Sequence, residues 1–235
     1  MPLYTADALI LRTYKLGEAD RIVVFLTRDR GKKRGVAKGA RRARSKFVGA
    51  LEPMTEARVA YFEKEQRELV GLNYAETIRS PLSHVGPAAP DGAPATEAGL
   101  HENALGYVGY FAELLDEWAQ EADADDRLYR LGASMLDAMA AGAPVEPLAR
   151  YFEYWLLRLQ GVYPEARGTL SDGAVAFLTG SRSVAPDRVG DLPVERRALT
   201  ELENVHRMLI ATHLEKTLKS DRVLRDLRRP PRHSA

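Results

Sequence analysis

The stretch of residues 21–46 reads RIVVFLTRDRGKKRGVAKGARRARSK and joins a strand-forming run to a dense basic segment. Its first seven residues, from Arg21 to Thr27, are mostly β-branched or aromatic, which predicts a buried strand. From Arg30 to Lys46 the stretch has nine lysines and arginines and no acidic residue. Glycines and apolar residues are interleaved with these charges, which a solvated tail would not need. The stretch therefore predicts a strand that leads into a folded, basic surface.

The positive charge of the chain is local. All 235 residues together contain 34 basic and 33 acidic side chains, a formal net charge of +1. Residues 1–80 hold 17 basic and 10 acidic residues, and residues 81–235 hold 17 and 23. Clustered cations favour contact with a polyanion, because binding releases counterions from its phosphates. A solvated charge run is the alternative interpretation of the cluster.

The first 80 residues predict a small β-barrel. Glycine, aspartate and other turn residues separate five runs with strand character. Five strands in so short a segment favour a closed barrel, since an open sheet would leave edges to protect. The expected strands are Ala6–Leu16, Arg21–Thr27, Lys33–Lys38, Glu56–Lys64 and Arg67–Ile78.

The remainder of the chain predicts helices, so the fold class is α+β. Residues 81–99 are rich in Pro, Ala and Gly, which predicts a linker or long loop. Apolar residues then recur at helical spacing through residues 100–235, which predicts a helical domain. We expect an irregular segment at 161–191, followed by one long helix from Glu195 to Leu227.

Composition excludes several kinds of protein. The chain has no cysteine, so disulfides, thiolate metal sites and cysteine nucleophiles are absent. Its longest apolar runs, such as Ile22 to Leu26, are too short to cross a bilayer, and charged residues near the N-terminus argue against a signal peptide. We therefore expect a cytoplasmic protein.

The usual catalytic motifs do not occur. There is no G-x-x-x-x-G-K-[ST] loop and no G-x-S-x-G elbow. His101 and Glu102 begin an H-E-x-x pattern, but position 105 is Leu where a second histidine is needed. His206 and His213 are seven residues apart, about 10.5 Å along a helix and too far for one metal ion. We expect no enzymatic activity, no cofactor and no metal site.

Three segments carry a resemblance to a known family. They read LILRTYKLGEADRIV at 9–23, TRDRG at 27–31 and AKGARRARSKFVGALEP at 37–53. In these segments the chain resembles the RecO family of bacterial recombination mediators. The resemblance implies an N-terminal five-stranded OB-fold barrel followed by an all-helical domain. It also implies a non-enzymatic protein that binds single- and double-stranded DNA, anneals complementary strands, contacts the acidic tail of single-stranded-DNA-binding protein, and works with RecR to load RecA.

The resemblance and the charge cluster together give the expected DNA-binding residues. An OB barrel holds nucleic acid in a cationic groove, with aromatic rings stacked on bases. Phe47 is the nearest aromatic residue, and it can serve either as a stacking platform or as a buried anchor. The expected DNA-binding residues are Arg28, Arg30, Lys32, Lys33, Arg34, Lys38, Arg41, Arg42, Arg44 and Lys46.

The helical half offers two further basic sets. Lys216, Lys219, Arg222 and Arg225 are spaced by three near the C-terminus, where they either contact DNA or an acidic partner or only stabilise a helix end. Arg150, Tyr154 and Arg158 are expected on the outer face of a helix, where they would receive an acidic peptide tail.

The family also has a metal site that this chain cannot form. Many RecO proteins carry a four-cysteine zinc site in the region that corresponds to 161–191, and this chain has no cysteine. We expect Val162–Thr179 to keep a hairpin or loop without metal.

Two other functions compete with DNA-repair mediation. An RNA-binding or ribosome-associated OB-fold module would show the same basic barrel. An enzyme that uses carboxylates of the acidic helical half is the third alternative.

Overall fold

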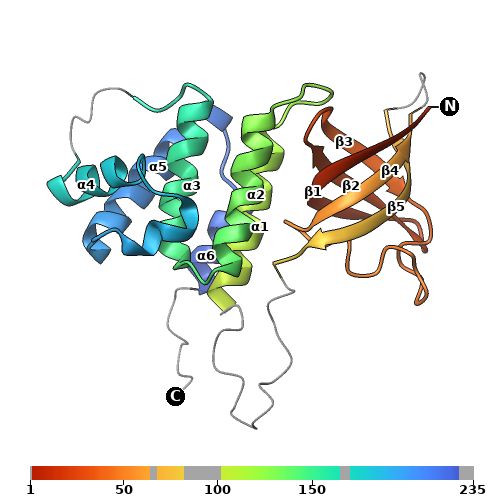
Figure 1. The fold of residues 1–235 in the computed structure, drawn as a ribbon, viewed down its shortest axis with the longest axis horizontal. Helices are drawn as coiled ribbons and strands as arrows, with labels where there is room; N and C mark the ends of the chain where they lie inside the picture. Colours follow the sequence, from red (N-terminus) through yellow and green to blue (C-terminus); the bar gives the residue numbers. More distant parts are fainter. Residues whose placement is uncertain (1, 64–67, 82–101, 165–169, 228–235) are drawn as a thin grey trace, which may run out of the picture. The chain divides into compact units, whose positions relative to one another are not determined.

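The computed structural model describes residues 2–63, 68–81, 102–164 and 170–227 (Figure 1). Five strands come first along the chain, and helices follow. The strands are β1 (Leu3–Leu16), β2 (Asp20–Thr27), β3 (Gly31–Ala37), β4 (Glu56–Phe62) and β5 (Val70–Arg79). Each lies within a few residues of the run that predicted it.

The five strands close into a barrel in the order β1-β2-β3-β5-β4 (Figure 1). All neighbours pair antiparallel except β3 and β5, which pair parallel over Gly35 to Ala37 and Val70 to Leu72. This arrangement confirms the predicted OB-fold barrel. The short pairing of β3 with β5 leaves the start of β3 to other partners, and Lys32 there forms a parallel bridge with Glu121.

Alternate residues of the strands fill the barrel. The interior includes Ile10, Phe25, Val59 and Tyr61, all without solvent exposure. Burial raises the pKa of the Tyr61 hydroxyl to about 12. Phe47 joins the same core from the segment between β3 and β4, with 3% of its surface exposed. Of the two roles that the sequence left open for Phe47, the structure therefore gives it that of a buried anchor.

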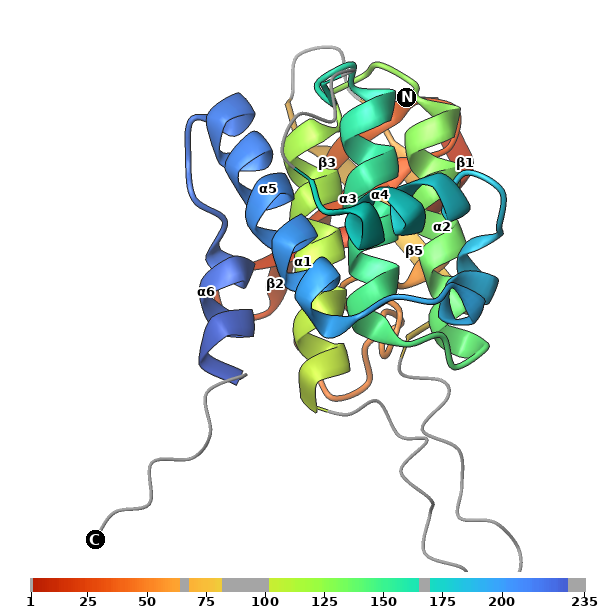
Figure 2. The ribbon, with the colours of Figure 1, turned by 90° about the vertical axis from the view of Figure 1, so that its left-hand side faces the viewer.

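Six α-helices and one 3-10 helix lie in the described part of the chain after the barrel. None of them is long and apolar enough to cross a bilayer. Figure 2 shows α5 beside α3, and the two helices are in contact. The helices are α1 (Glu102–Trp118), α2 (Asp126–Ala140), α3 (Val145–Leu159), α4 (Asp172–Gly180), η1 (Pro186–Asp191), α5 (Arg196–Leu214) and α6 (Lys219–Leu227).

The chain divides into two compact units, and the division falls inside α1 and α2. One unit, called here the barrel unit, combines the barrel with Phe111–Leu136. The other, called here the helical unit, contains the remaining helices and runs over Val85–Tyr110 and Asp137–Ala235. The predicted boundary near residues 80–100 did not anticipate that part of α1 and α2 belongs with the barrel. The predicted linker, residues 81–99, lies outside the described residues apart from Pro81.

Within residues 161–191 the prediction of an irregular segment was wrong. Helix α4 and the 3-10 helix η1 occupy most of its described residues. Ser171 caps α4, its side chain accepting a hydrogen bond from the backbone amide of Ala174. Phe177 and Leu178 of α4 are buried, so a short apolar face stabilises a helix that the flanking glycines obscured. The expected hairpin or loop over Val162–Thr179 is likewise replaced by α4 in its described part.

The single long helix predicted from Glu195 to Leu227 is two helices. Helix α5 ends at Leu214, and Glu215 adopts a left-handed conformation with φ 53°. Helix α6 begins at Lys219, and Figure 2 shows the turn of chain between the two. The apolar periodicity continues across the break, which is why sequence pattern alone did not reveal it.

Candidate nucleic-acid interface

The basic segment forms β3 and a turn-rich connection from residue 38 to residue 55. Backbone hydrogen bonds of the i to i+3 type recur along this connection, as between Arg42 and Gly39. Its start is fixed to the turn between β1 and β2. The Gly39 amide donates to Asp20 Oδ1 at 2.7 Å, and the Arg41 amide donates to the Ala19 carbonyl at 2.9 Å. The connection is thus a defined surface and not a solvated tail.

The side chains of this connection divide between the core and the solvent. Phe47, Ala50 and Leu51 are buried in the barrel. The cations point the other way and are exposed, as is Arg34 on β3. None of them has a carboxylate within ion-pair distance among the described residues. We call this set the exposed cations: Arg34, Lys38, Arg41, Arg42, Arg44 and Lys46.

The other four predicted DNA-binding residues are already engaged. Arg28 donates to Asp126 at 2.8 Å, which raises the pKa of its guanidinium, and Arg30 lies 4.2 Å over the ring of Tyr4. Lys32 contacts Asp116, with Nζ 3.3 Å from Oδ1, and Lys33 Nζ lies 2.6 Å from Glu63 Oε1.

The engaged cations lie around the start of β3, whereas five of the six exposed cations lie beyond its end. The side chains of Lys32 and Lys33 are each only 16% exposed. Strand β3 has seven residues, so about 20 Å separates its first residue, Gly31 next to Arg30, from its last residue, Ala37 next to Lys38. The structure therefore splits the predicted site into an engaged set around the start of β3 and a set of exposed cations, of which Arg34 lies within β3 and the other five follow it.

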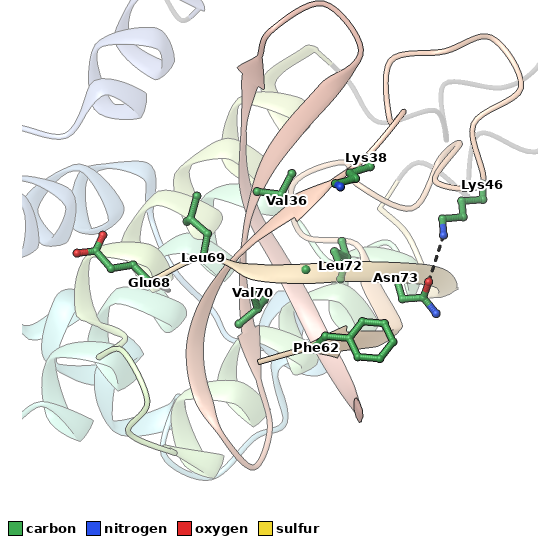
Figure 3. A pocket seen from close by; sticks show the side chains of 10 residues that line it. Val36, Lys38, Lys46, Phe62, Glu68, Leu69, Val70, Leu72 and Asn73 are labelled. Carbon is green, nitrogen blue, oxygen red and sulfur yellow. Dashed lines mark hydrogen bonds between the residues drawn. The ribbon is translucent and has the colours of Figure 1, made fainter. Parts of the chain in front are cut away.

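A groove adjoins the exposed cations (Figure 3). It has a volume of about 630 Å³ and lies where β3, the end of β4 and the start of β5 meet. Lys46 reaches across its mouth and donates from Nζ to Asn73 Oδ1 at 3.4 Å (Figure 3). The lining residues are Val36, Lys38, Lys46, Phe62, Glu68, Leu69, Val70, Gly71, Leu72 and Asn73.

Sequence reasoning missed this groove. The apolar residues that line it, and Gly71, were predicted only as parts of the expected strands Lys33–Lys38, Glu56–Lys64 and Arg67–Ile78. The alternation of Tyr61 and Phe62 carried a usable signal, because it places one of the two rings outside the barrel. Which outward residues meet across three strands depends on register, which the sequence did not give.

In the helical unit, the prediction that Arg150, Tyr154 and Arg158 lie on the outer face of α3 was wrong for the first two residues. Arg150 and Tyr154 are each 3% exposed, and only Arg158 is exposed. Arg150 pairs with Glu153 at 2.7 Å and with Glu203 at 3.3 Å. Helix α3 is packed on more than one side, which a single apolar stripe did not reveal. Arg150 is therefore part of the interior and not a contact for a peptide.

Arg158 and Tyr154 do meet at a pocket. Arg158 Nη1 donates to the Tyr154 hydroxyl at 3.2 Å, and both residues line a cavity of about 420 Å³. Tyr163 and Arg182 line the same cavity. Two arginines and two tyrosines form a surface suited to an anionic group with an apolar neighbour.

The second basic set, at the end of the chain, lies partly in α6. Arg225 pairs with Asp221 at 3.0 Å, one helical turn away. Arg222 is exposed, as are Lys216 and Lys219. This partner within the helix favours the interpretation that Arg225 only stabilises a helix end. Contact of this set with a partner stays a prediction.

No group of three or more metal-ligating side chains occurs within the described ranges. His206 is buried in α5 and bonded to Glu153 through Nδ1, and His213 is exposed. The two histidines do not converge.

Comparison with known proteins assigns the family. Residues 1–81 match the family described as Recombination protein O N terminal, and residues 103–169 match Recombination protein O C terminal. A protein of Nocardioides sp. (strain ATCC BAA-499 / JS614), named DNA repair protein RecO, is 35% identical over 258 residues, covering 93% of this chain and 97% of the relative. The chain belongs to the RecO family.

Other RecO proteins match over a shorter region. The DNA repair protein RecO of Koribacter versatilis is 38% identical over 163 residues, which cover 69% of this chain and 61% of that protein. That of Bifidobacterium adolescentis is 41% identical over 144 residues, covering 61% of this chain and 52% of the relative. The matched region thus spans less than two thirds of these two RecO relatives.

Proposed function

We propose that this RecO-family protein binds DNA through the exposed cations and acts as a mediator of recombinational DNA repair. The observation that carries the proposal is a set of six cations that have no carboxylate partner among the described residues. One of them, Arg34, lies on β3, and the other five lie on the connection that is fixed to the OB barrel. Unpaired cations retain their full attraction for phosphate, whereas a cation already in an ion pair must break that pair first. Membership in a family whose relatives are named DNA repair protein RecO supports the same role.

The finer activities belong to the same proposal. The protein binds single- and double-stranded DNA, anneals complementary strands, and works with RecR to load RecA onto DNA coated with single-stranded-DNA-binding protein. It acts in the cytoplasm by binding and without chemical turnover. The pocket at Tyr154 and Arg158 in the helical unit receives the acidic tail of single-stranded-DNA-binding protein, because its arginines complement carboxylates.

Salt-dependent binding of a labelled single-stranded oligonucleotide tests the DNA site. Four phosphate contacts predict a log-log slope of about −3, from about −0.7 per contact. The double variant Arg41→Glu/Arg42→Glu should weaken binding to all sequences alike and reduce this slope. Arg196→Glu/Arg197→Glu changes the charge equally at another exposed adjacent pair and should leave binding nearly unchanged. Equal loss in both variants would reject the proposed site.

Competition with structured RNA tests the alternative function. A mediator of DNA repair should keep its single-stranded DNA when equal nucleotide concentrations of structured RNA are added. Clear preference for RNA would favour an RNA-binding module and count against the proposal.

Annealing of oligonucleotides coated with single-stranded-DNA-binding protein tests the partner. Coated strands should anneal with that protein's acidic tail present and fail to anneal when the tail is removed. Arg158→Glu should produce the same loss while annealing of bare strands continues. Tail-independent annealing would remove the assignment of the pocket.

A further inference from the structure

Three residues form a row across the outside of the barrel at the groove. In the register of the sheet, Gly71 of β5 lies between Val36 of β3 and Phe62 of β4. Their neighbours Ala37, Tyr61 and Leu72 are buried, so the three residues of the row face outward. The row therefore presents an aliphatic side chain, a bare backbone and an aromatic ring in sequence.

The glycine leaves a slot between the two side chains. Adjacent strands are about 4.8 Å apart, so the backbones at Val36 and Phe62 are about 10 Å apart. A Cβ at Gly71 would meet no atom of the described residues within 4 Å, so with respect to them the space above Gly71 is open. A glycine inside a strand often marks the close approach of a ligand. The slot suits one flat ring lying against Phe62, since stacked rings sit about 3.4 Å apart in a DNA strand.

The charged side chains around the slot are mostly basic, which favours an occupant that carries negative charge. Arg34 lies two residues before Val36, and Lys38 lies two residues after it. Because alternate residues of a strand face the same side, both face outward with Val36, and both are exposed. Lys46 is held at the mouth by Asn73. Among the described residues that line the groove, Glu68 is the one carboxylate. An occupant with a flat apolar face and flanking negative charge matches this surface, and a nucleotide has both.

We propose that the groove binds an unpaired base of single-stranded DNA, with the base between Val36 and Phe62 over Gly71 and the neighbouring phosphates at Lys38 and Lys46. The inference rests on the proposed DNA binding and adds a preference to it. A base in a duplex is paired and stacked, so only single strands can fill the slot without an opening cost. The exposed cations alone would hold any phosphate backbone.

Gly71→Val offers a clean test because it fills the slot from within. The position has open space, its backbone is not left-handed, and valine is favoured in strands, so the barrel should remain folded. Thr77→Val is the matched control, an exposed β5 position outside the residues that line the groove. Binding is measured by fluorescence anisotropy with an oligothymidine and with an abasic oligonucleotide of the same length and phosphate count.

The wild-type protein should bind the oligothymidine about tenfold more tightly than the abasic strand, the effect of one ordinary stacking contact. In Gly71→Val the affinity for the oligothymidine should fall to about that for the abasic strand, and the affinity for the abasic strand should remain unchanged. Phe62→Ala, which removes the ring without filling the slot, should also lower the ratio. Thr77→Val should behave as wild type.

The outcomes separate this inference from the proposed function. Equal wild-type affinity for the two strands would overturn the base-binding slot and leave backbone binding intact. No wild-type binding to either strand would refute the proposed function itself. A ratio that survives in Gly71→Val would remove the base from this groove. If the groove takes an acidic peptide instead, the two strands bind equally and Gly71→Val loses the peptide, which also overturns the inference.

Discussion

Nδ1 of His206 lies 2.9 Å from Oε2 of Glu153 in the interior of the helical unit. Glu153 Oε1 also accepts from Arg150 Nη2 and from the Tyr110 hydroxyl, each at 2.7 Å. Because an ionised carboxylate only accepts, Nδ1 of His206 must be the donor. Burial by itself would raise the pKa of Glu153, but Arg150 and the hydrogen bond from His206 outweigh it and hold that pKa below its ordinary value. The buried negative charge of Glu153 is therefore compensated by Arg150 and by the hydrogen bonds from His206 and Tyr110.

Removing Arg150 should destabilise the protein, because the buried carboxylate of Glu153 would lose its cation. Arg150→Leu leaves Glu153 without its cation, and we expect the free energy of unfolding to fall by about 3–5 kcal/mol, as for other broken buried pairs. Arg158→Leu, at an exposed position of the same helix, should change it by about 0.5 kcal/mol or less. Urea unfolding followed by circular dichroism gives both values. Similar small losses in the two variants would show that the pair contributes no more than a surface contact.

Acid should weaken the helical unit through the same carboxylate. The pKa of Glu153 is lower in the folded protein than the unfolded value of about 4.3, so the unfolded state binds its proton first. The contribution of Glu153 is complete above that value and is lost as pH falls toward the folded pKa. Urea midpoints measured from about pH 7 down to about pH 3 should therefore fall less steeply in Glu153→Gln than in wild type. Glu195→Gln, an exposed control, should follow the wild-type curve.

Much of the fold was predictable because local signals agreed with it. The β-branched run at residues 21–27 predicted β2, and the expected strand Glu56–Lys64 lies where β4 is found. Five such runs in 80 residues were enough for a barrel. The helical unit was harder, since α4 is short and flanked by glycines, and the end of α5 depends on the left-handed conformation of Glu215, which no pattern signals.

The candidate site was predictable as a segment but not as a surface. The charge cluster located β3 and the connection after it. It did not distinguish Lys33, which pairs with Glu63 thirty residues away, from Arg42, which has no such partner among the described residues. Nor did it place Phe62 beside Gly71. Both facts depend on the register in which strands pair, which is set only when the strands assemble.

The engaged and the exposed cations should behave differently on substitution. Arg42→Gln removes one phosphate contact, and we expect single-stranded DNA affinity to fall about three- to fivefold at roughly 0.1 M salt. Lys33→Gln should leave that affinity within about twofold and lower the free energy of unfolding by about 1 kcal/mol, because Glu63 loses its partner. Anisotropy and urea unfolding on the same preparations check both. A loss of DNA affinity in Lys33→Gln as large as that in Arg42→Gln would mean that the ion pair opens on binding.

The region that carries a zinc site in many family members should be stable here without metal. The backbone amide of Ser171 donates to Glu201 Oε1 at 2.9 Å, and the Ser171 hydroxyl donates to the other oxygen. These hydrogen bonds lower the pKa of Glu201. Trp155 Nε1 also donates to the Ser181 carbonyl at 3.2 Å. We expect excess EDTA to leave the melting temperature unchanged, and Glu201→Ala to lower the free energy of unfolding by about 1 kcal/mol. A drop in melting temperature with EDTA would reveal a bound metal.

Two glycines with similar backbone angles should differ sharply in their tolerance of a side chain. Gly31 and Gly49 have φ values of 67° and 74°, so an alanine at either position is strained by about 1–2 kcal/mol. At Gly49 a Cβ would meet nothing within 4 Å in the described part of the chain. At Gly31 it would lie against the backbone of Asp123, well inside the 3.0 Å that real Cβ contacts respect. Overpacking there should add about 1–3 kcal/mol to the loss of unfolding free energy in Gly31→Ala. Equal losses for Gly31→Ala and Gly49→Ala in urea unfolding would mean that residue 123 does not pack against the start of β3.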